Sequence, residues 1–483
     1  MSFISFAFVV FLAITIAARL TLGRRSNAAR FLAFLLLASL VFYGWHEPRY
    51  LLIVLASAAL DYVAAGLIAT PGRSPRARRW LLTGSMALNL GLLGFFKYTN
   101  FALGTAGDVA AWLGYSRTWM PTLDVVLPIG ISFYTFQSMS YTIDVYRGHL
   151  QPAPSFARLL LCVTFFPHLV AGPIVRARDL LHQFDRPRRL RLVVVGHAAW
   201  LVVRGLFLKM VVADNVGVYL AGVPGGASGA WAAGYVPGAD AALLWMAVFM
   251  FTIQIFCDFA GYTDIARGVA YLVGIRLPLN FDYPYIATSF SNFWRRWHIS
   301  LSTWLRDYLY ISLGGNRRSR ARTYVNLLAV MLIGGLWHGA AWTFVIWGGI
   351  HGVALVVERM LGLDRKAVGG WQSTVVTLAW CVVVQFTVMM AWVFFRCDSL
   401  EHSLTFVRNL FGGPWHQPAL SVEQTFPLLL CLPVVAMHLR TLVDERFKRT
   451  APGPIERAVW ATCMSYAVVT LYGRSNEFIY FQF

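Results

Sequence analysis

Residues 331–342 read MLIGGLWHGAAW, an apolar run without Lys, Arg, Asp or Glu that carries a histidine, His338, near its centre. The run lies within a longer apolar stretch, 325–361, which contains Gly334, Gly335, Gly339, Gly348 and Gly349. Small residues let helix backbones approach closely in lipid. The stretch therefore predicts a helical hairpin, with His338 at membrane depth.

The rest of the chain has the composition of a multi-pass membrane protein. Of its 483 residues, 58% are hydrophobic and 13% are charged, whereas soluble domains carry about 25% charged residues. Apolar runs that can cross a bilayer occur near 3–22, 31–45, 50–69, 80–96, 124–145, 192–212, 240–273, 371–395, 425–439 and 457–472, and the run 156–175 is typical of a re-entrant segment. We expect an all-α polytopic membrane protein of about 10–12 transmembrane helices, folded as a single domain over 1–483.

Several function classes are excluded by what the sequence lacks. The net charge of +19 is explained by arginine-rich loops on the cytoplasmic side of a membrane, and no nucleic-acid-binding motif accompanies it. The six cysteines include no CxxC pair, so we expect no metal site. Phosphate-binding loops, nucleophile elbows and HExxH motifs are also missing from the sequence, which gives soluble hydrolase or ATPase chemistry no support.

Loop charge predicts the orientation in the membrane. The segment 276–322 carries eight arginines, whereas 213–240 carries no Lys or Arg. Because basic residues favour the anionic cytoplasmic surface, we expect 276–322 in the cytoplasm and 213–240 outside.

His338 is the first candidate for chemistry. An ionisable side chain in a membrane is expensive and therefore marks a functional site by default; the alternative is a packed histidine bonded to a neighbouring helix. Histidine exchanges a proton near neutral pH, so it can activate an alcohol for attack on an acyl group. His351, farther along the same hairpin, is expected to be structural.

The second candidate, His298, lies in the aromatic and arginine-rich segment 276–322. From Phe290 to Tyr308 the apolar residues recur with the i, i+3, i+4, i+7 spacing of an amphipathic helix, which predicts one helix at the cytoplasmic interface. His298 falls between its two faces. It can turn inward toward a cavity, or it is an interfacial histidine without a role.

Arginines follow the polar face of that predicted helix. Arg295, Arg296 and Arg306 can bind the phosphates of coenzyme A, because a guanidinium binds phosphate in a bidentate manner. The alternative is that they only set the topology.

Three more polar side chains interrupt apolar runs: Asp258, Asp264 and His168. Two carboxylates in a membrane segment are costly unless they are paired. We therefore expect them to form ion pairs, with arginines such as Arg267, in preference to lining a cavity. His168 stands between two prolines and is expected to shape a cavity.

The string FWRRWHISLSTWLRDYLY at 293–310 resembles the signature of membrane-bound O-acyltransferases of the alginate O-acetyltransferase branch. The resemblance spans about the whole chain, and teichoic acid D-alanyl transferases of the same superfamily fit these strings less well. The other matching strings are LPIGISFY (127–134), FFPHLVAGP (165–173), DFAGYTD (258–264), GGNR (314–317), GGLWHG (334–339) and FIYFQF (478–483).

The resemblance implies a ring of membrane helices with re-entrant segments around a thin core, in a bacterial inner membrane. It implies His338 as the main catalytic histidine and His298 as the second. Acetyl-CoA would be the donor and no cofactor would be tightly bound. An exported, alginate-like polysaccharide would be the acceptor, reached through a periplasmic SGNH-type acetyltransferase. The candidates for donor or substrate binding are Arg295, Arg296, Arg306, Trp297, Trp337, Asp258, Asp264 and His168.

Three alternatives stay open at this point. The chain transfers another acyl or D-alanyl group to a different envelope polymer; or it is a transporter whose histidines and acids relay protons; or it is a non-catalytic scaffold of an export complex.

Overall fold

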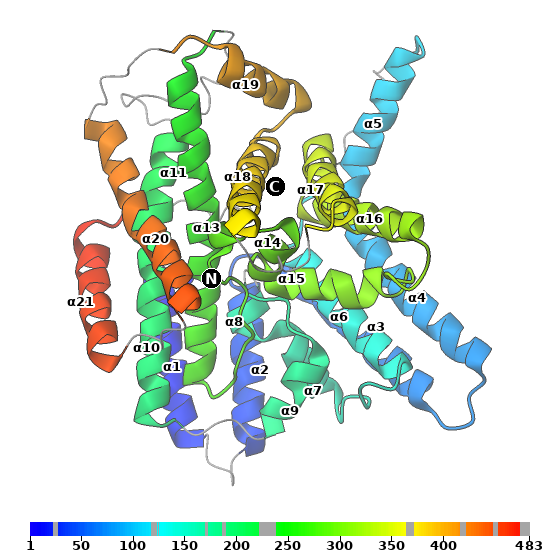
Figure 1. Cartoon of the computed structure of the whole chain (residues 1–483). Coiled ribbons are helices and arrows are strands. Elements are labelled where there is room, and N and C mark those ends of the chain that lie inside the picture. Colours follow the sequence, from blue (N-terminus) through cyan, green and yellow to red (C-terminus); the bar gives the residue numbers. More distant parts are fainter. Residues whose placement is uncertain are drawn as a thin grey trace. The chain divides into compact units, whose positions relative to one another are not determined.

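The structure is a computed structural model of the whole chain. It describes residues 1–22, 28–116, 123, 125–169, 172–185, 190–221, 238–363, 371–415, 422–447 and 453–473. Every regular element within these ranges is helical (Figure 1), which confirms the predicted all-α class. The chain divides into two compact units, Met1–Val202 with Ile265–Pro278 and Val203–Asp264 with Leu279–Phe483. The single domain over 1–483 stays a prediction.

The first unit packs α3 against α4, α6 and α7. Local signals in the sequence set its helix ends: Ser74 Oγ accepts a hydrogen bond from the Ala77 amide and Pro75 follows as the first helical residue, which is the usual start of a helix. Its helices are α1 (Phe6–Leu22), α2 (Ala28–Gly44), α3 (Leu51–Ala69), α4 (Pro75–Leu93), α5 (Thr99–Trp112), α6 (Ile131–Tyr146), α7 (Phe156–Thr164), α8 (Phe166–Leu169) and α9 (Ala177–Asp185). Within the run 156–175 the described residues form two short helices, α7 and α8, and the predicted re-entrant segment stays a prediction.

The second unit contains the predicted hairpin. Two helices, α10 (Leu192–Leu206) and α13 (Ala241–Leu272), continue from one unit into the other. The other helices of the second unit are α11 (Asp214–Ala221), α14 (Phe290–Arg296), α15 (Ile299–Trp304), α16 (Arg320–His338), α17 (Trp342–Met360), α18 (Trp371–Arg396), α19 (Leu400–Gly412), α20 (Val422–Phe447) and α21 (Pro454–Thr470).

Six helices in the described ranges are long and apolar enough to cross a membrane: Pro48–Ala69, Leu192–Leu220, Ala241–Leu272, Trp342–Met360, Val375–Arg396 and Thr425–Phe447. Two shorter apolar helices are Phe6–Leu22 and Ala29–Gly44. Large apolar side chains are exposed along several of these helices, such as Leu52 of α3, Val382 of α18 and Leu432 of α20. Such side chains suit contact with lipid, in which helices satisfy their own backbone hydrogen bonds. The chain is therefore a multi-pass membrane protein, and the count of about 10–12 spans stays a prediction.

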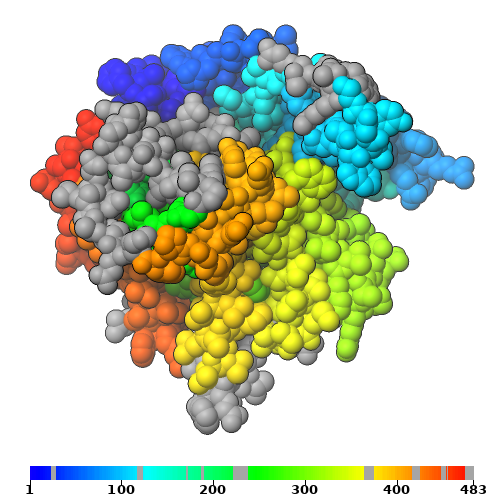
Figure 2. All heavy atoms as spheres, turned by 90° about the horizontal axis from the view of Figure 1, so that it is seen from above, coloured from blue at the N-terminus to red at the C-terminus, as the bar shows by residue number. Residues whose placement is uncertain are grey.

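The hairpin forms as α16 and α17, which pack along each other. Glycines make this close contact possible: a Cβ at Gly335 would collide with the Phe344 carbonyl oxygen, and a Cβ at Gly348 with the Met331 carbonyl oxygen. On one face of the molecule the yellow-green surface of the hairpin adjoins the yellow surface of α18 (Figure 2). The close helix packing that the glycine pattern predicted is thereby confirmed.

The continuous amphipathic helix predicted from Phe290 to Tyr308 is wrong. The structure ends α14 at Arg296, begins α15 at Ile299 and continues in a π-helix, Leu305–Tyr310. Between the two helices His298 adopts a left-handed backbone conformation with φ 41°, which a helix interior does not allow. The apolar periodicity continues across the break between α14 and α15, and therefore the sequence pattern did not reveal the break.

The loop predicted over 213–240 also begins later than expected. The chain forms a π-helix, Phe207–Ala213, and then α11, which ends at Ala221. Asp214 is buried in this helical segment, where its ion pair with Lys209 explains why a carboxylate does not mark a loop here. Residues 222–237 lie outside the described ranges.

Candidate active site

A cavity of about 230 Å³ lies in the second unit, between the hairpin α16–α17 and the segment of α14, α15 and the following π-helix. Its volume is well above the 30 Å³ or so that one water occupies in the liquid. The walls between its two ends are mostly apolar. The lining residues are Trp294, Leu301, Ser302, Leu305, Arg306, Tyr310, Leu327, Val330, Met331, Gly334, His338, Trp347, Leu355 and Arg359.

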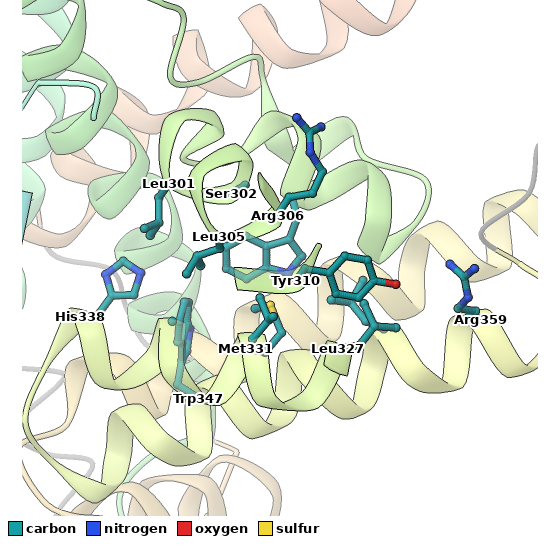
Figure 3. A pocket seen from close by; sticks show the side chains of 14 residues that line it. Leu301, Ser302, Leu305, Arg306, Tyr310, Leu327, Met331, His338, Trp347 and Arg359 are labelled. Carbon is teal, nitrogen blue, oxygen red and sulfur yellow. The ribbon is translucent and has the colours of Figure 1, made fainter. Parts of the chain in front are cut away.

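His338 lies at the buried end of this cavity (Figure 3). It is the last residue of α16 and only 4% exposed. Its ring centroid lies 5.1 Å from that of Trp337, 5.0 Å from Trp347 and 5.6 Å from Phe395. The imidazole is therefore held among aromatic rings while one side remains open to the cavity.

His298, the second predicted catalytic histidine, lies beside His338. The two ring centroids are 6.1 Å apart, and the His298 ring also packs edge-on against Phe259 at 4.7 Å. His298 is fully buried and lies outside the candidate spans. Burial lowers the pKa of His298 to about 3, because the charged imidazolium is poorly solvated there. His298 is therefore neutral near pH 7, as a base or hydrogen-bond acceptor must be.

The opposite end of the cavity is open and basic. Arg306 and Arg359 line it together with Tyr310 (Figure 3), and both arginines are exposed. Arg306 also forms an ion pair with Asp307, at 2.6 Å, although its side chain remains 60% exposed. The cavity thus runs from an exposed cationic end to a buried histidine.

The other two predicted arginines do not line the cavity. Arg295 is exposed. Arg296 forms an ion pair with Glu445 of α20, with 2.8 Å between Nη2 and Oε2, and donates a hydrogen bond to the Asp282 carbonyl oxygen at 3.1 Å. In the structure Arg296 holds α14 to its neighbours.

The two predicted tryptophans pack among other rings outside the lining of the cavity. Trp337 packs against both His298, at 5.9 Å, and His338, at 5.1 Å. Trp297 is fully buried and stacks on Phe293 with an interplanar angle of 10°. Neither is among the cavity-lining residues, so they shape the surroundings of the site.

The predicted pairing of the acids is confirmed, but with other partners. Lys209 Nζ lies 2.7 Å from Asp258 Oδ1 and 2.7 Å from Asp214 Oδ1, and Arg204 Nη2 lies 2.6 Å from Asp264 Oδ2. Both basic residues come from the helical segment that begins with α10, whereas the suggested partner Arg267 lies on α13 itself. Asp258 and Asp264 do not line the cavity.

His168 belongs to the first unit, where it is buried in α8. Its Nε2 lies 3.0 Å from Gln137 Oε1. His351 belongs to the second unit and is fully buried. It stacks on Phe293 with ring centroids 5.9 Å apart and an interplanar angle of 7°, as a packing residue does.

Sequence reasoning missed three residues of this region. Arg359 lines the cavity, and Glu358 beside it is fully buried. Glu358 Oε1 accepts a hydrogen bond from the Ser291 amide at 2.9 Å and its other oxygen accepts one from the Phe290 amide, so that it caps α14. Glu358 and Arg359 are adjacent charged residues near the end of the apolar helix α17. This was the signal in the sequence by which they could have been found. Asn280, which contacts His298, carried no such signal.

The geometry defines the class of protein: a multi-pass membrane protein with two neighbouring imidazoles, one at the buried end of a cavity with a cationic mouth. Such an arrangement can bind a long anionic donor and remove a proton from a hydroxyl at the buried end. No group of three His, Cys, Asp or Glu within the described residues could hold a metal ion.

Comparison with known proteins identifies the family. The model of the membrane-bound O-acyltransferase family matches residues 88–400. A probable alginate O-acetylase of Azotobacter vinelandii is 39% identical over 411 residues, which cover 84% of this chain and 78% of that protein. A peptidoglycan O-acetyltransferase of Helicobacter pylori is 36% identical over 406 residues, covering 78% of this chain and 73% of that protein.

The chain therefore belongs to the membrane-bound O-acyltransferase family, as the sequence motifs predicted. It is an O-acyltransferase, and its relatives support an O-acetyltransferase. A teichoic acid D-alanyltransferase of Streptococcus thermophilus is also similar, at 30% identity over 257 residues that cover 50% of this chain and 60% of that protein. The match to this D-alanyltransferase is thus shorter than the matches to the two acetyltransferases.

Proposed function

We propose that this enzyme moves an acetyl group from acetyl-CoA across the membrane toward hydroxyls of an exported polysaccharide, with His338 as the general base. The observation that supports this most strongly is the cavity itself. It joins exposed Arg306 and Arg359 to buried His338 through an apolar passage. Acetyl-CoA has the matching order of groups: phosphates, a thin arm and a terminal thioester.

The arginines suit the phosphate end of the donor. A guanidinium binds phosphate with two parallel hydrogen bonds, and Tyr310 adds a hydroxyl at the same end. The arm would then lie along Leu305, Leu327 and Met331 (Figure 3). In this arrangement the thioester reaches the imidazole of His338.

The proposed step is direct acyl transfer. His338 takes the proton of the acceptor hydroxyl, the hydroxyl oxygen attacks the thioester carbonyl carbon, and the carbon–sulfur bond breaks. The departing thiolate takes up the proton from the His338 imidazolium, so that the products are an acetyl ester and free coenzyme A and the base is regenerated. Neutral His298 lies close enough to orient the hydroxyl or to share in the proton transfer. General base catalysis typically contributes about 10²- to 10⁴-fold in rate.

The cellular setting follows from charge and from the relatives. The arginine-rich segment 276–322 favours the cytoplasmic side of a bacterial inner membrane. Coenzyme A is held in the cytoplasm, so the donor would enter from that side. The acceptor would approach from the other side, with an SGNH-type periplasmic acetyltransferase completing transfer to the polymer. Relatives named for alginate and for peptidoglycan O-acetylation favour a carbohydrate acceptor, and an alginate-like polymer fits best.

The test uses the purified full chain in detergent, with and without an SGNH-type periplasmic acetyltransferase, and supplies acetyl-CoA labelled in the acetyl group and a panel of oligosaccharides. We expect release of free thiol that depends on the acceptor, together with label in an alkali-labile ester. D-alanyl thioesters serve as competing donors. Tight acetyl-CoA binding without thiol release under any acceptor would contradict the proposal and favour a carrier role. Preference for a D-alanyl donor would indicate instead that the enzyme works as the teichoic acid D-alanyltransferases of the family do.

A further inference from the structure

A buried asparagine, Asn280, lies beside the second histidine and contacts it directly. Its Oδ1 lies 3.2 Å from His298 Nδ1, and it also accepts hydrogen bonds from the Ser300 amide at 3.1 Å and the Ser300 hydroxyl at 2.8 Å. Its backbone carbonyl accepts a further one from the Ile299 amide at 2.9 Å. Both Asn280 and His298 are fully buried.

These contacts decide which way the Asn280 amide is turned. A backbone N–H can only donate, so the atom that faces the Ser300 amide must be the oxygen of the side chain and not its nitrogen. The same oxygen faces His298 Nδ1. An oxygen can only accept there, which means that Nδ1 carries the hydrogen and Nε2 carries the lone pair.

We propose that Asn280 is a positioning residue that holds His298 as the tautomer with a hydrogen on Nδ1, so that Nε2 carries the lone pair that accepts a proton or hydrogen bond from the acceptor hydroxyl. The proposal rests on the proposed function only for the role of Nε2. The tautomer itself follows from Asn280 and Ser300 alone.

The backbone around His298 supports a positioning role. His298 has a φ of 41°, a conformation that is strained for any residue with a Cβ. The hydrogen bonds from Ile299 and Ser300 to Asn280 take the place of a side-chain N-cap at the start of α15, since His298 makes no side-chain cap bond. Asn280 thus fixes both the backbone and the ring of His298.

Asn280 also has a feature that a purely structural cap would avoid. Its Nδ2 is buried without a hydrogen-bond partner within the described residues, which is unfavourable for an amide. An aspartate can accept the same hydrogen bonds at a helix start without such a donor. Retaining an amide here is understandable if the site needs a neutral acceptor beside His298, because a carboxylate would favour the imidazolium.

The first test reads the tautomer directly and needs no substrate. The full chain in detergent is labelled with ¹⁵N-histidine, and the His298 signals are assigned by comparison with a His298→Gln variant. We expect Nδ1 to show the protonated-nitrogen signal and Nε2 the lone-pair signal. In Asn280→Ala the preference should be lost. The opposite tautomer in the unsubstituted protein would overturn the proposal, even if the enzyme is fully active.

The second test uses the pH profile of Asn280→Asp. A carboxylate can accept the same hydrogen bonds, yet it favours the charged imidazolium and should raise the pKa of His298 by about one to three units. Within the described residues, the ring of His298 contacts the rings of Phe259, Phe281, Trp337 and the titratable His338. Because a charged His298 can accept neither a proton nor a hydrogen bond from the hydroxyl, kcat should begin to fall at a higher pH than in the unsubstituted enzyme.

The control is Asn409→Asp. Asn409 is also a buried asparagine of the second unit, and its Oδ1 accepts a hydrogen bond from the Gly238 amide at 3.3 Å. This variant should keep the original pH profile. A folded Asn280→Asp enzyme whose profile matches that of the control would contradict the positioning role. Absence of turnover in the unsubstituted protein would instead refute the proposed function and leave the tautomer test standing.

Discussion

Two buried polar side chains of this protein, Asp61 and His338, have opposite surroundings. In the first unit, the Asp61 carboxylate is fully buried and accepts hydrogen bonds from Ser85 at 2.6 Å, Asn89 at 3.0 Å and Thr142 at 3.2 Å. In the second unit, His338 is almost as deeply buried, but aromatic rings surround it and it opens on a cavity.

The difference separates polar groups that hold helices together from those that meet a substrate. The donors around Asp61 come from α4 and α6 while the carboxylate is on α3, so one acceptor ties three helices together in a setting where such bonds are favourable. His338 packs among aromatic rings and lines a cavity instead. Burial alone therefore does not identify a reactive group, whereas burial beside a cavity does.

The largest effect that tests this comparison is expected from His338→Ala. Removing the base should lower kcat about 10²- to 10⁴-fold, while the melting temperature changes little because the helix end remains capped by neighbouring backbone. Thiol release from acetyl-CoA and thermal unfolding in detergent measure the two effects. Near-normal turnover by a well-folded variant would remove His338 from the catalytic role.

Asp61→Ala should produce the reverse result. It leaves the donors of Ser85, Asn89 and Thr142 without their acceptor, and the loss of stability should be about 2 kcal/mol. The fraction that remains folded should turn over at close to the normal rate. Asp61→Asn keeps an acceptor oxygen and should lose less stability. A stable but inactive Asp61→Ala enzyme would break the comparison, because Asp61 would then take part in function.

The sequence predicted the fold class, the hairpin and the family, because all three depend on patterns carried by the chain itself. Composition and apolar periodicity predicted helices in a membrane, and the glycines near His338 predicted the close packing of α16 on α17. These features are set by residues that are near one another in sequence.

The parts that the sequence did not predict depend on tertiary contacts. The break at His298 is held by Asn280, 18 residues away, and the partners of Asp258 and Asp264 come from another helix. Arg359 and Arg306 line the same cavity, although they are 53 residues apart in the sequence. The roles of the predicted site residues stay predictions that the variants described here test.

A smaller effect is expected from Arg359→Ala at the cationic mouth. Losing one phosphate contact at an exposed position should raise KM for acetyl-CoA about tenfold, equivalent to roughly 1.4 kcal/mol, with little change in kcat. KM for acetyl-pantetheine, which lacks the phosphates, should not change. Arg322→Ala, an exposed arginine in the first turn of α16, is the control. Equal effects on both donors would show that Arg359 does not bind phosphate.

The smallest effect should come from His351→Phe, in the same hairpin as His338. Neither ring nitrogen of His351 has a hydrogen-bond partner within the described residues, and its ring lies flat on Phe293. A phenyl ring preserves this stacking and removes no hydrogen bond, so that stability should stay within about 0.5 kcal/mol and kcat should change less than about twofold, far below the effect of a lost base. Turnover and thermal unfolding are measured beside those of His338→Ala. If His351→Phe were folded but as inactive as His338→Ala, two histidines with different surroundings would share one role, and a cavity beside the ring would no longer distinguish a reactive histidine from a packed one.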